Sequence, residues 1–227
     1  MIASSFNKIV SGYNKNDLVE NIDDLIIRVH DRIYEDYKSY EEKEASRAIK
    51  KYFENEIDIG AVTNDRLLEV ISSRYSELNT FTLSLSQARK SRAGKTFEKI
   101  LYNFFNKLSI PFSFQPEVDG RPDFIIPGID DYHNTPQDCL VITAKRTVRE
   151  RWRQVATEGA RGYRFMLATI DDKISKNALN KMRENQITLV IPEQLISDTD
   201  HYSSSNIIIS YKKLFSNYIV NTLSNFQ

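Results

Sequence analysis

The sequence predicts an α/β protein in which a mixed β-sheet is flanked by helices and preceded by a helical subdomain. Short apolar runs in the second half of the chain alternate with helix-like segments, and a hairpin pattern with Asp119-Gly120 at its turn comes before them. Strand–helix–strand connections imply parallel strands with right-handed crossovers, whereas the hairpin adds an antiparallel pair. The first 85 residues carry helical periodicity instead.

Composition indicates an ordinary globular protein. Of 227 residues, 41% are hydrophobic and 27% are charged, which is typical of a soluble chain. This length suits one large domain or a main domain with a smaller appendage. The single cysteine, Cys139, lies in an apolar run and is expected to be a buried small side chain. No apolar stretch approaches the roughly 20 residues of a membrane span, and the N-terminus lacks the apolar core of a signal peptide. We therefore expect a cytoplasmic protein without a membrane partner.

The charge distribution says more than the formal net charge of +0. Residues 1–60 contain thirteen acidic and nine basic side chains, whereas residues 89–99 and residues 145–153 each contain five basic side chains and one acidic one. Two basic clusters predict a local site for phosphate. Solvated helix faces are the alternative for either cluster taken alone.

The N-terminal part is predicted to be helical, which sets it apart from the rest of the chain. Within residues 15–53 we expect two helices, the second beginning near residue 40, and a further helix capped by Thr63-Asn64-Asp65. The chain is divided into residues 1–85, a helical subdomain, and residues 86–227, a catalytic core. The subdomain could carry a dimer interface or additional DNA contacts, and both possibilities stay open.

The core is predicted from a succession of elements. A helix is expected over residues 91–108, with Glu98 off its apolar stripe, and the tail should form a short strand and a terminal helix. The central elements are a hairpin over residues 110–127, strands at 140–145, 163–170 and 188–192, and helices at 148–161 and 175–185.

Two residues at strand ends suggest the chemistry. Asp123 begins the apolar run of the second hairpin strand, and Lys145 ends the next strand. Neighbouring strands would bring these side chains together, and an acid beside a lysine is expected of a metal-dependent phosphodiesterase. Glu158 follows the lysine by thirteen residues.

This pattern resembles the PD-(D/E)XK nuclease superfamily and, within it, the type II restriction endonucleases of the EcoRII, SsoII and PspGI group. The matching elements are Pro122-Asp123, Ala144-Lys145 twenty-two residues after the aspartate, the later glutamate, and the upstream stretch R-K-S-R-A-G-K-T-F-E over residues 89–98. The resemblance covers about residues 86–195 and implies a restriction-endonuclease-like fold.

The resemblance also implies roles for the acids and the lysine. Asp123 would be the central Mg²⁺ ligand, Glu158 the second, and Glu98 would help to hold another ion or a bound water. Lys145 would orient the attacking water and stabilise the charge that develops on phosphorus. Thr143 stands where the superfamily usually has an acid, and in this group the following helix supplies the carboxylate, which Glu158 matches. By helix spacing alone, Glu98 could equally be an exposed residue that pairs with a lysine.

DNA recognition is expected from the residues after the lysine. Arginine can donate two hydrogen bonds to guanine and glutamate can accept one from cytosine, so that Arg149, Glu150 and Arg151 suit GG/CC half-sites, as in CCNGG-, CCWGG- or CCGG-like palindromes. We expect phosphate contacts from Lys90, Arg92 and Lys95, with solvated charge as the alternative. Double-stranded DNA is the expected partner.

The predicted function is a homodimeric, Mg²⁺-dependent type II restriction endonuclease with a companion methyltransferase in the same system. Alternatives are a repair or structure-selective nuclease of the same fold and a catalytically silent DNA-binding protein. No zinc spacing joins the histidines, which are expected to be structural or exposed, and Trp152 is expected to be a packing anchor. The histidines are His30, His133 and His201.

Overall fold

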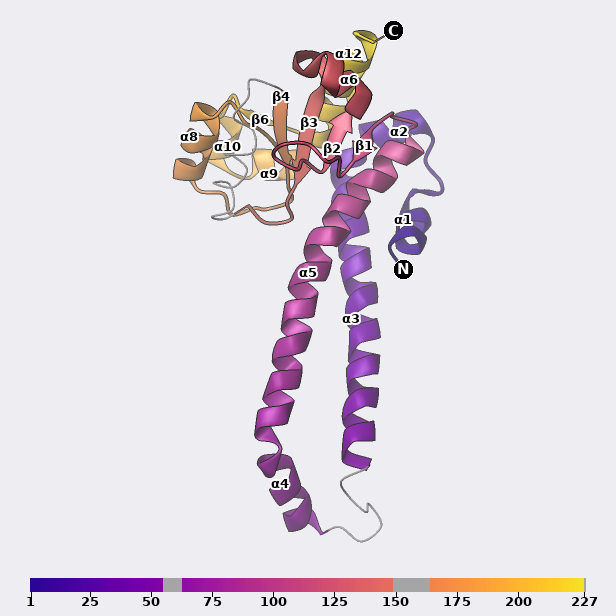
Figure 1. The fold of residues 1–227 in the computed structure, drawn as a ribbon, viewed down its shortest axis with the longest axis vertical. Coiled ribbons are helices and arrows are strands. Elements are labelled where there is room, and N and C mark those ends of the chain that lie inside the picture. Colours follow the sequence, from indigo (N-terminus) through magenta and orange to yellow (C-terminus); the bar gives the residue numbers. More distant parts are fainter. Residues whose placement is uncertain (55–62, 149–163, 227) are drawn as a thin grey trace.

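A computed structural model describes residues 1–54, 63–148 and 164–226. Two long helices lie side by side and project from a domain that contains the β-sheet, and both chain ends lie toward that domain (Figure 1). Among the residues described, no helix is both long enough and apolar enough to cross a membrane.

The N-terminal helices differ from the prediction in their boundaries. The predicted break near residue 40 is wrong, because one helix continues through this region and the break between helices falls at Asn21. The intervening sequence contains neither glycine nor proline, and Arg32 pairs with Asp36 at helical spacing, 3.2 Å between Nε and Oδ1, which favours a continuous helix. The helices are α1 (Ile2–Val10), α2 (Lys15–Glu20), α3 (Ile22–Glu54), α4 (Asn64–Ser73) and α5 (Tyr75–Lys107).

The helix predicted to begin at residue 91 is the second half of α5, which begins at Tyr75. Residue 85, where the sequence analysis divided the chain, therefore lies inside a continuous helix. The N-cap expected near Thr63 is present, because the Thr63 hydroxyl accepts a hydrogen bond from the backbone N–H of Arg66 at 3.4 Å.

The mixed sheet that the sequence predicts is confirmed. Among the described residues it has six strands in chain order: the second strand pairs antiparallel with both the first and the third, and the third to the sixth are parallel. The helix predicted at 148–161 falls largely on residues outside the described ranges. The strands are β1 (Ser113–Phe114), β2 (Phe124–Ile126), β3 (Leu140–Ala144), β4 (Arg164–Ala168), β5 (Thr188–Val190) and β6 (Ile208–Ile209).

Helices cover both faces of the sheet, because alternate residues of each strand are buried in different cores. Ile142 of β3 packs in a cluster with α1, α3, α5 and the C-terminal helices, whereas Val141 packs in a second cluster with α8. Phe215, near the C-terminus, contacts Phe105 with ring centroids 5.4 Å apart. The remaining helical segments are α6 (Ile129–Asn134), η1 (Pro136–Asp138), α8 (Lys176–Glu184), α9 (Glu193–Ser197), α10 (Asp200–Ser203), α11 (Tyr211–Lys213), η3 (Leu214–Ile219) and α12 (Val220–Ser224).

Candidate active site

The ends of β2 and β3 bring Asp123 and Lys145 together. These strands are antiparallel with Phe124 opposite Ile142, so the residue that precedes β2 lies beside the residues that end β3. The Oδ2 atom of Asp123 accepts hydrogen bonds from the backbone N–H of Ala144 at 2.7 Å and from Nζ of Lys145 at 3.3 Å. The pairing follows directly from the strand register.

Solvent reaches the lysine more readily than the acid. The Asp123 side chain is 8% exposed and that of Lys145 is 30% exposed. Asp123 also lines a hollow of about 840 Å³, together with residues 115–119, Arg121 and Pro122. Both hydrogen bonds go to one carboxylate oxygen, Oδ2, so the other oxygen is the one that a cation from this hollow would take.

Glu98, on α5, belongs to the same site. Burial raises the pKa of the Glu98 carboxyl, and the negative charge of Asp123 raises it further, while Lys145 and Lys95 act in the opposite direction. The Oε2 atom of Glu98 accepts a hydrogen bond from Nε2 of Gln115 at 3.0 Å. A cation bound here would offset the electrostatic cost that these two acids impose on each other.

Gln115 is a site residue that the sequence analysis did not single out. Its backbone N–H donates to the carbonyl of Asp123 at 2.8 Å, while its side chain holds Glu98. Its φ of 48° is in the left-handed region, which a non-glycine residue adopts only when its surroundings stabilise it. Hairpin symmetry about Asp119 places Gln115 opposite Asp123, so the register was the signal that could have identified it.

The donor set fits a hard divalent cation, although the described residues supply only part of it. Asp123 and Glu98 offer the carboxylate oxygens that Mg²⁺ prefers. Among the residues whose positions are described, no cluster of three or more His, Cys, Asp or Glu could hold a metal ion. Glu158, the predicted second ligand, lies outside the described residues. Thr143 is fully buried, and its Oγ1 has no hydrogen-bond partner in the described part of the chain.

The basic residues on α5 have unequal surroundings. Arg92 is paired with the buried Glu41 of α3, as is Arg89, and the guanidinium of Arg92 also lies 5.9 Å from the ring centroid of Tyr37. Lys90 and Lys95 are exposed.

With a helix expected to begin at residue 91, Lys90, Arg92 and Lys95 would precede or open it, where backbone N–H groups favour anions. They lie well inside α5 instead, so this expected contribution to phosphate binding was wrong. The predicted DNA-reading residues Arg149, Glu150 and Arg151, and Trp152, lie outside the described residues.

Comparison with known proteins places this geometry in a family. The family described as EcoRII C terminal matches residues 37–214. The chain belongs to this family. The type II restriction enzyme SsoII of Shigella sonnei is 26% identical over 213 residues, which are 88% of this chain and 69% of the relative. The type II restriction enzyme EcoRII of Escherichia coli is 30% identical over 138 residues, which are 57% of this chain and 34% of the relative.

Solved structures agree with this architecture. Metal-depleted Ecl18kI in complex with uncleaved, modified DNA has a TM-score of 0.84 at 23% identity, with 98% of this chain and 76% of that chain covered. A complex of PspGI with substrate DNA has a TM-score of 0.71 at 20% identity, with 99% and 93% covered. The resemblance drawn from the sequence is confirmed, and so is the enzyme class, a type II restriction endonuclease.

Proposed function

We propose that this protein is a Mg²⁺-dependent homodimer that hydrolyses double-stranded DNA at a short palindrome with GG/CC half-sites. The observation that carries the proposal is the contact between Asp123 and Lys145 beside Glu98, because it joins two carboxylates to a cationic group, and Asp123 lines a hollow. The two structural neighbours described above, which are DNA complexes, support DNA as the partner.

Each side chain of the site has a part in the proposed reaction. Mg²⁺ bound at Asp123 and Glu98 would supply positive charge for the phosphate and for a deprotonated water. Asp123 orients the ammonium group of Lys145 through their 3.3 Å contact. Lys145 can donate its remaining hydrogens to the attacking water and to a phosphate oxygen, which stabilises charge that develops only in the transition state. Gln115 holds Glu98 toward the same point.

Specificity in this proposal comes from Arg149, Glu150 and Arg151, which follow the site in sequence. Their side chains suit guanine and cytosine in the major groove, in line with the half-sites that the resemblance stated from the sequence implies. Lys90 and Lys95 are exposed for phosphate contact, whereas Arg92 would act from its ion pair with Glu41. A cytoplasmic location and a companion methyltransferase belong to the same proposal, because the host's own copies of the site need protection.

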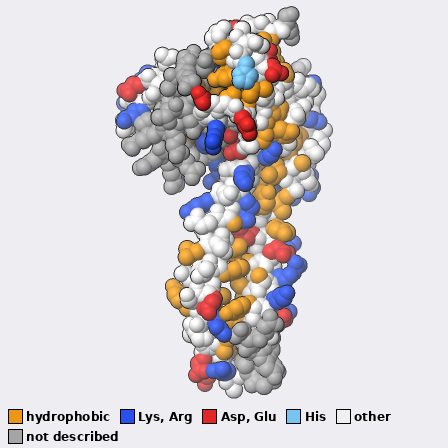
Figure 2. All heavy atoms as spheres, in the orientation of Figure 1, with side chains coloured by type: hydrophobic (Ala, Val, Ile, Leu, Met, Phe, Trp, Pro, Cys, Tyr) orange, Lys and Arg blue, Asp and Glu red, His pale blue; other side chains and the backbone are white. Residues whose placement is uncertain are grey.

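The dimer interface is assigned to the arm, defined here as the part of α3 beyond residue 33 together with α4 and residues 75–88 of α5. Hydrophobic side chains lie along the arm between acidic and basic ones (Figure 2). The large hydrophobic residues exposed there are Tyr34, Tyr40, Ile49, Leu67, Leu68, Ile71, Tyr75 and Leu83. Such a patch is typical of an interaction site.

Charge favours a second copy of the chain as the occupant of this surface. Acidic and basic side chains are interspersed along the arm helices and form ion pairs, such as Lys50 with Glu54 and Arg66 with Glu69. Residues 1–60 also carry more acidic than basic side chains. A polyanion would gain little from such a surface, whereas an identical copy would meet mixed charges and matching apolar residues. A two-fold dimer also provides one active site for each strand of a palindrome.

Sedimentation of arm variants tests the interface. Leu68→Glu combined with Tyr75→Glu is expected to convert the dimer to a monomer, because each change places a charge on an apolar contact surface. Val220→Glu, which alters a residue 54% exposed and remote from the arm, is the matched control and should remain dimeric. A dimer that persists in the arm variant would contradict this interface.

Digestion of a plasmid of known sequence tests the proposed specificity. With Mg²⁺, the protein is expected to give discrete fragments whose ends map to sites with paired G·C steps. Ends without such steps would refute the assignment of Arg149, Glu150 and Arg151. A smear would indicate a nuclease that does not read sequence.

A further inference from the structure

The segment that follows the catalytic lysine is held firmly on the side of β4. The backbone N–H of Lys145 donates to the carbonyl of Ala168 at 2.9 Å, and Oγ1 of Thr169 donates to the carbonyl of Arg146 at 3.2 Å. Two residues later, the backbone N–H of Val148 donates to Oδ2 of the buried Asp171 at 2.7 Å. The main chain on both sides of Arg146 therefore has little freedom.

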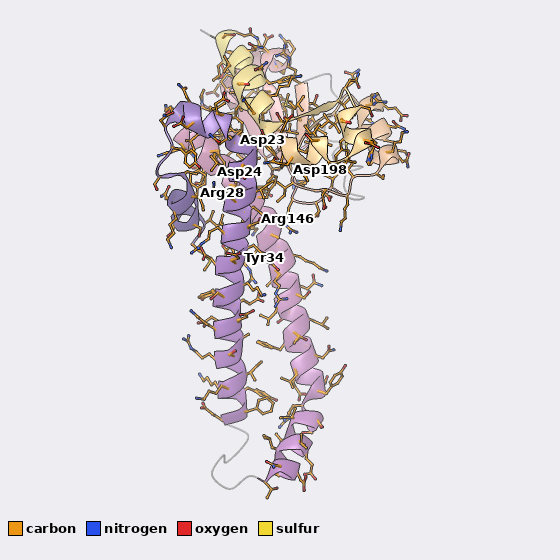
Figure 3. The ribbon with its side chains drawn as sticks, turned by 180° about the vertical axis from the view of Figure 1, so that it is seen from behind. Asp23, Asp24, Arg28, Tyr34, Arg146 and Asp198 are labelled. Carbon is orange, nitrogen blue, oxygen red and sulfur yellow. The ribbon has the colours of Figure 1, made fainter. Side chains whose placement is uncertain are left out.

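The side chain of Arg146 connects this segment to the N-terminal helix α3. Arg146 lies between the sheet domain and α3 (Figure 3), and it lines the same cavity as Tyr34. Its Nε donates to Nε2 of His30 at 3.0 Å, and His30 is only 8% exposed. The other ring nitrogen, Nδ1, lies 3.0 Å from Oδ1 of Asp31. An acceptor at Nε2 and a carboxylate at Nδ1 together specify the neutral tautomer that is protonated at Nδ1.

Protonation of His30 would be incompatible with this contact. The protonated ring has an N–H at both positions, so that Nε2 would present a hydrogen and a positive charge to the guanidinium of Arg146. Burial lowers the pKa of His30, and the charge of Arg146 lowers it further, whereas Asp31 raises it. Asp31 is 64% exposed, so solvent screens its effect.

Other charged groups surround the same position. His30 and Arg146 line a cavity of about 380 Å³ between α3 and α5. The charged groups that line it from α3 are Lys38, Glu41 and Glu42, and those from α5 are Arg89, Lys90 and Arg92. With Arg146 the cavity has more basic than acidic residues, which opposes a further positive charge on His30.

We propose that His30 is a positioning residue of the nuclease site: when neutral it fixes the Arg146 side chain, which together with the β4 contacts sets the direction of the adjacent Lys145, and when protonated it releases the Arg146 side chain. This inference rests on the proposed function only for its effect on cleavage. Above the pKa of His30 the contact is intact, and it is lost as the pH falls through that pKa. The cleavage rate should therefore decline as the pH falls, in part because His30, which we do not place in contact with DNA or metal, becomes protonated.

The experiment compares His30→Ala, His30→Gln and the control His133→Gln, an equivalent change at an exposed histidine of α6. At pH 8, loss of one hydrogen bond to a charged group should slow cleavage by His30→Ala about tenfold. His30→Gln should cleave at close to the wild-type rate, because its amide oxygen can accept from Arg146. As the pH falls, the cleavage rate of His30→Gln should decline less than that of wild type and of His133→Gln, because His30→Gln has no ring to protonate at this position.

A titration of the histidine resonances by NMR tests the contact independently of cleavage. In Arg146→Ala the pKa of His30 should rise, because the neighbouring guanidinium is absent, and the resonance is identified by its loss in His30→Gln. An unchanged His30 pKa in Arg146→Ala would overturn the inference, even if the wild-type protein cut no DNA and the proposed function failed. Wild-type cleavage by His30→Ala, or an unaltered acid decline in His30→Gln, would also overturn it.

Discussion

Asp23 should be one of the most sensitive positions for stability, although it lies outside the active site. This residue, near the start of α3, is 7% exposed and lies beside the C-terminal elements (Figure 3). Its Oδ1 accepts from the backbone N–H groups of Glu193 at 3.1 Å and Tyr211 at 2.8 Å, and its Oδ2 accepts from that of Lys212 at 3.0 Å. These donors begin α9 and α11, and a helix start leaves N–H groups that need acceptors.

The three lost acceptor contacts set the expected magnitude. Asp23→Ala leaves three N–H groups without their acceptor. Each should cost roughly 1 kcal/mol, the low end for such groups because water can enter the space, so the free energy of unfolding should fall by about 3 kcal/mol. Asp23→Asn keeps one acceptor oxygen and removes a charge that burial disfavours, since burial raises the pKa of Asp23. That variant should lose about 1 kcal/mol or less.

Urea unfolding of Asp23→Ala, Asp23→Asn and the control Asp24→Ala provides the measurement. Asp24 adjoins Asp23 in sequence but is 54% exposed, and within the described ranges it makes a surface pair with Arg28 at 3.3 Å. Its removal should change the free energy of unfolding by less than about 0.5 kcal/mol. If Asp23→Ala were no less stable than Asp24→Ala, the reasoning about the three N–H groups would be refuted.

Three further predictions concern the site and the core. Glu98→Gln should stabilise the metal-free protein at neutral pH, because it removes a carboxylate whose pKa is raised by burial and by Asp123. It should also weaken Mg²⁺ binding in calorimetric titrations, and unchanged Mg²⁺ affinity would contradict the role of Glu98 as a metal ligand. Thr143→Val should leave the free energy of unfolding in urea unchanged or raise it by up to about 1 kcal/mol, because the buried Oγ1 has no partner among the described residues. Cleavage should persist, and a marked loss of stability or of cleavage would show that the hydroxyl is used. Burial raises the pKa of Cys139 to about 11, so iodoacetamide at pH 8 should label it only after unfolding, and rapid labelling of the native protein detected by mass spectrometry would contradict its burial.

The sheet and the Asp123–Lys145 pair could be predicted because both depend on local patterns. Buried apolar runs such as Leu140–Ala144 identify strands, and the hairpin turn fixes which residues lie opposite one another. The pairing of an acid before β2 with a lysine after β3 then follows from strand adjacency. Glu98 could be placed near this pair only through the family resemblance, because its position depends on how α5 packs.

The long helices and the distant contacts could not be predicted from local patterns. In residues 75–90 the apolar side chains Leu78, Phe81 and Leu85 stand at helical spacing but are only half-buried, whereas Tyr75 and Leu83 are exposed on the arm, and such a weakly buried face marks the start of a helix poorly. The contact between His30 and Arg146 joins positions 116 residues apart. That between Glu41 and Arg92 joins positions 51 apart. No spacing rule connects such residues before the fold is known.

The central claim, that Asp123, Lys145 and Glu98 form the nuclease site, is tested most directly by single-turnover cleavage with Lys145→Ala. Saturating protein and Mg²⁺ separate the chemical step from binding, and urea unfolding confirms that the variant is folded. The account predicts that DNA affinity is retained while the cleavage rate falls by roughly 10³-fold, the effect of removing a group that stabilises the transition state. Cleavage by Lys145→Ala within tenfold of the wild-type rate would contradict it.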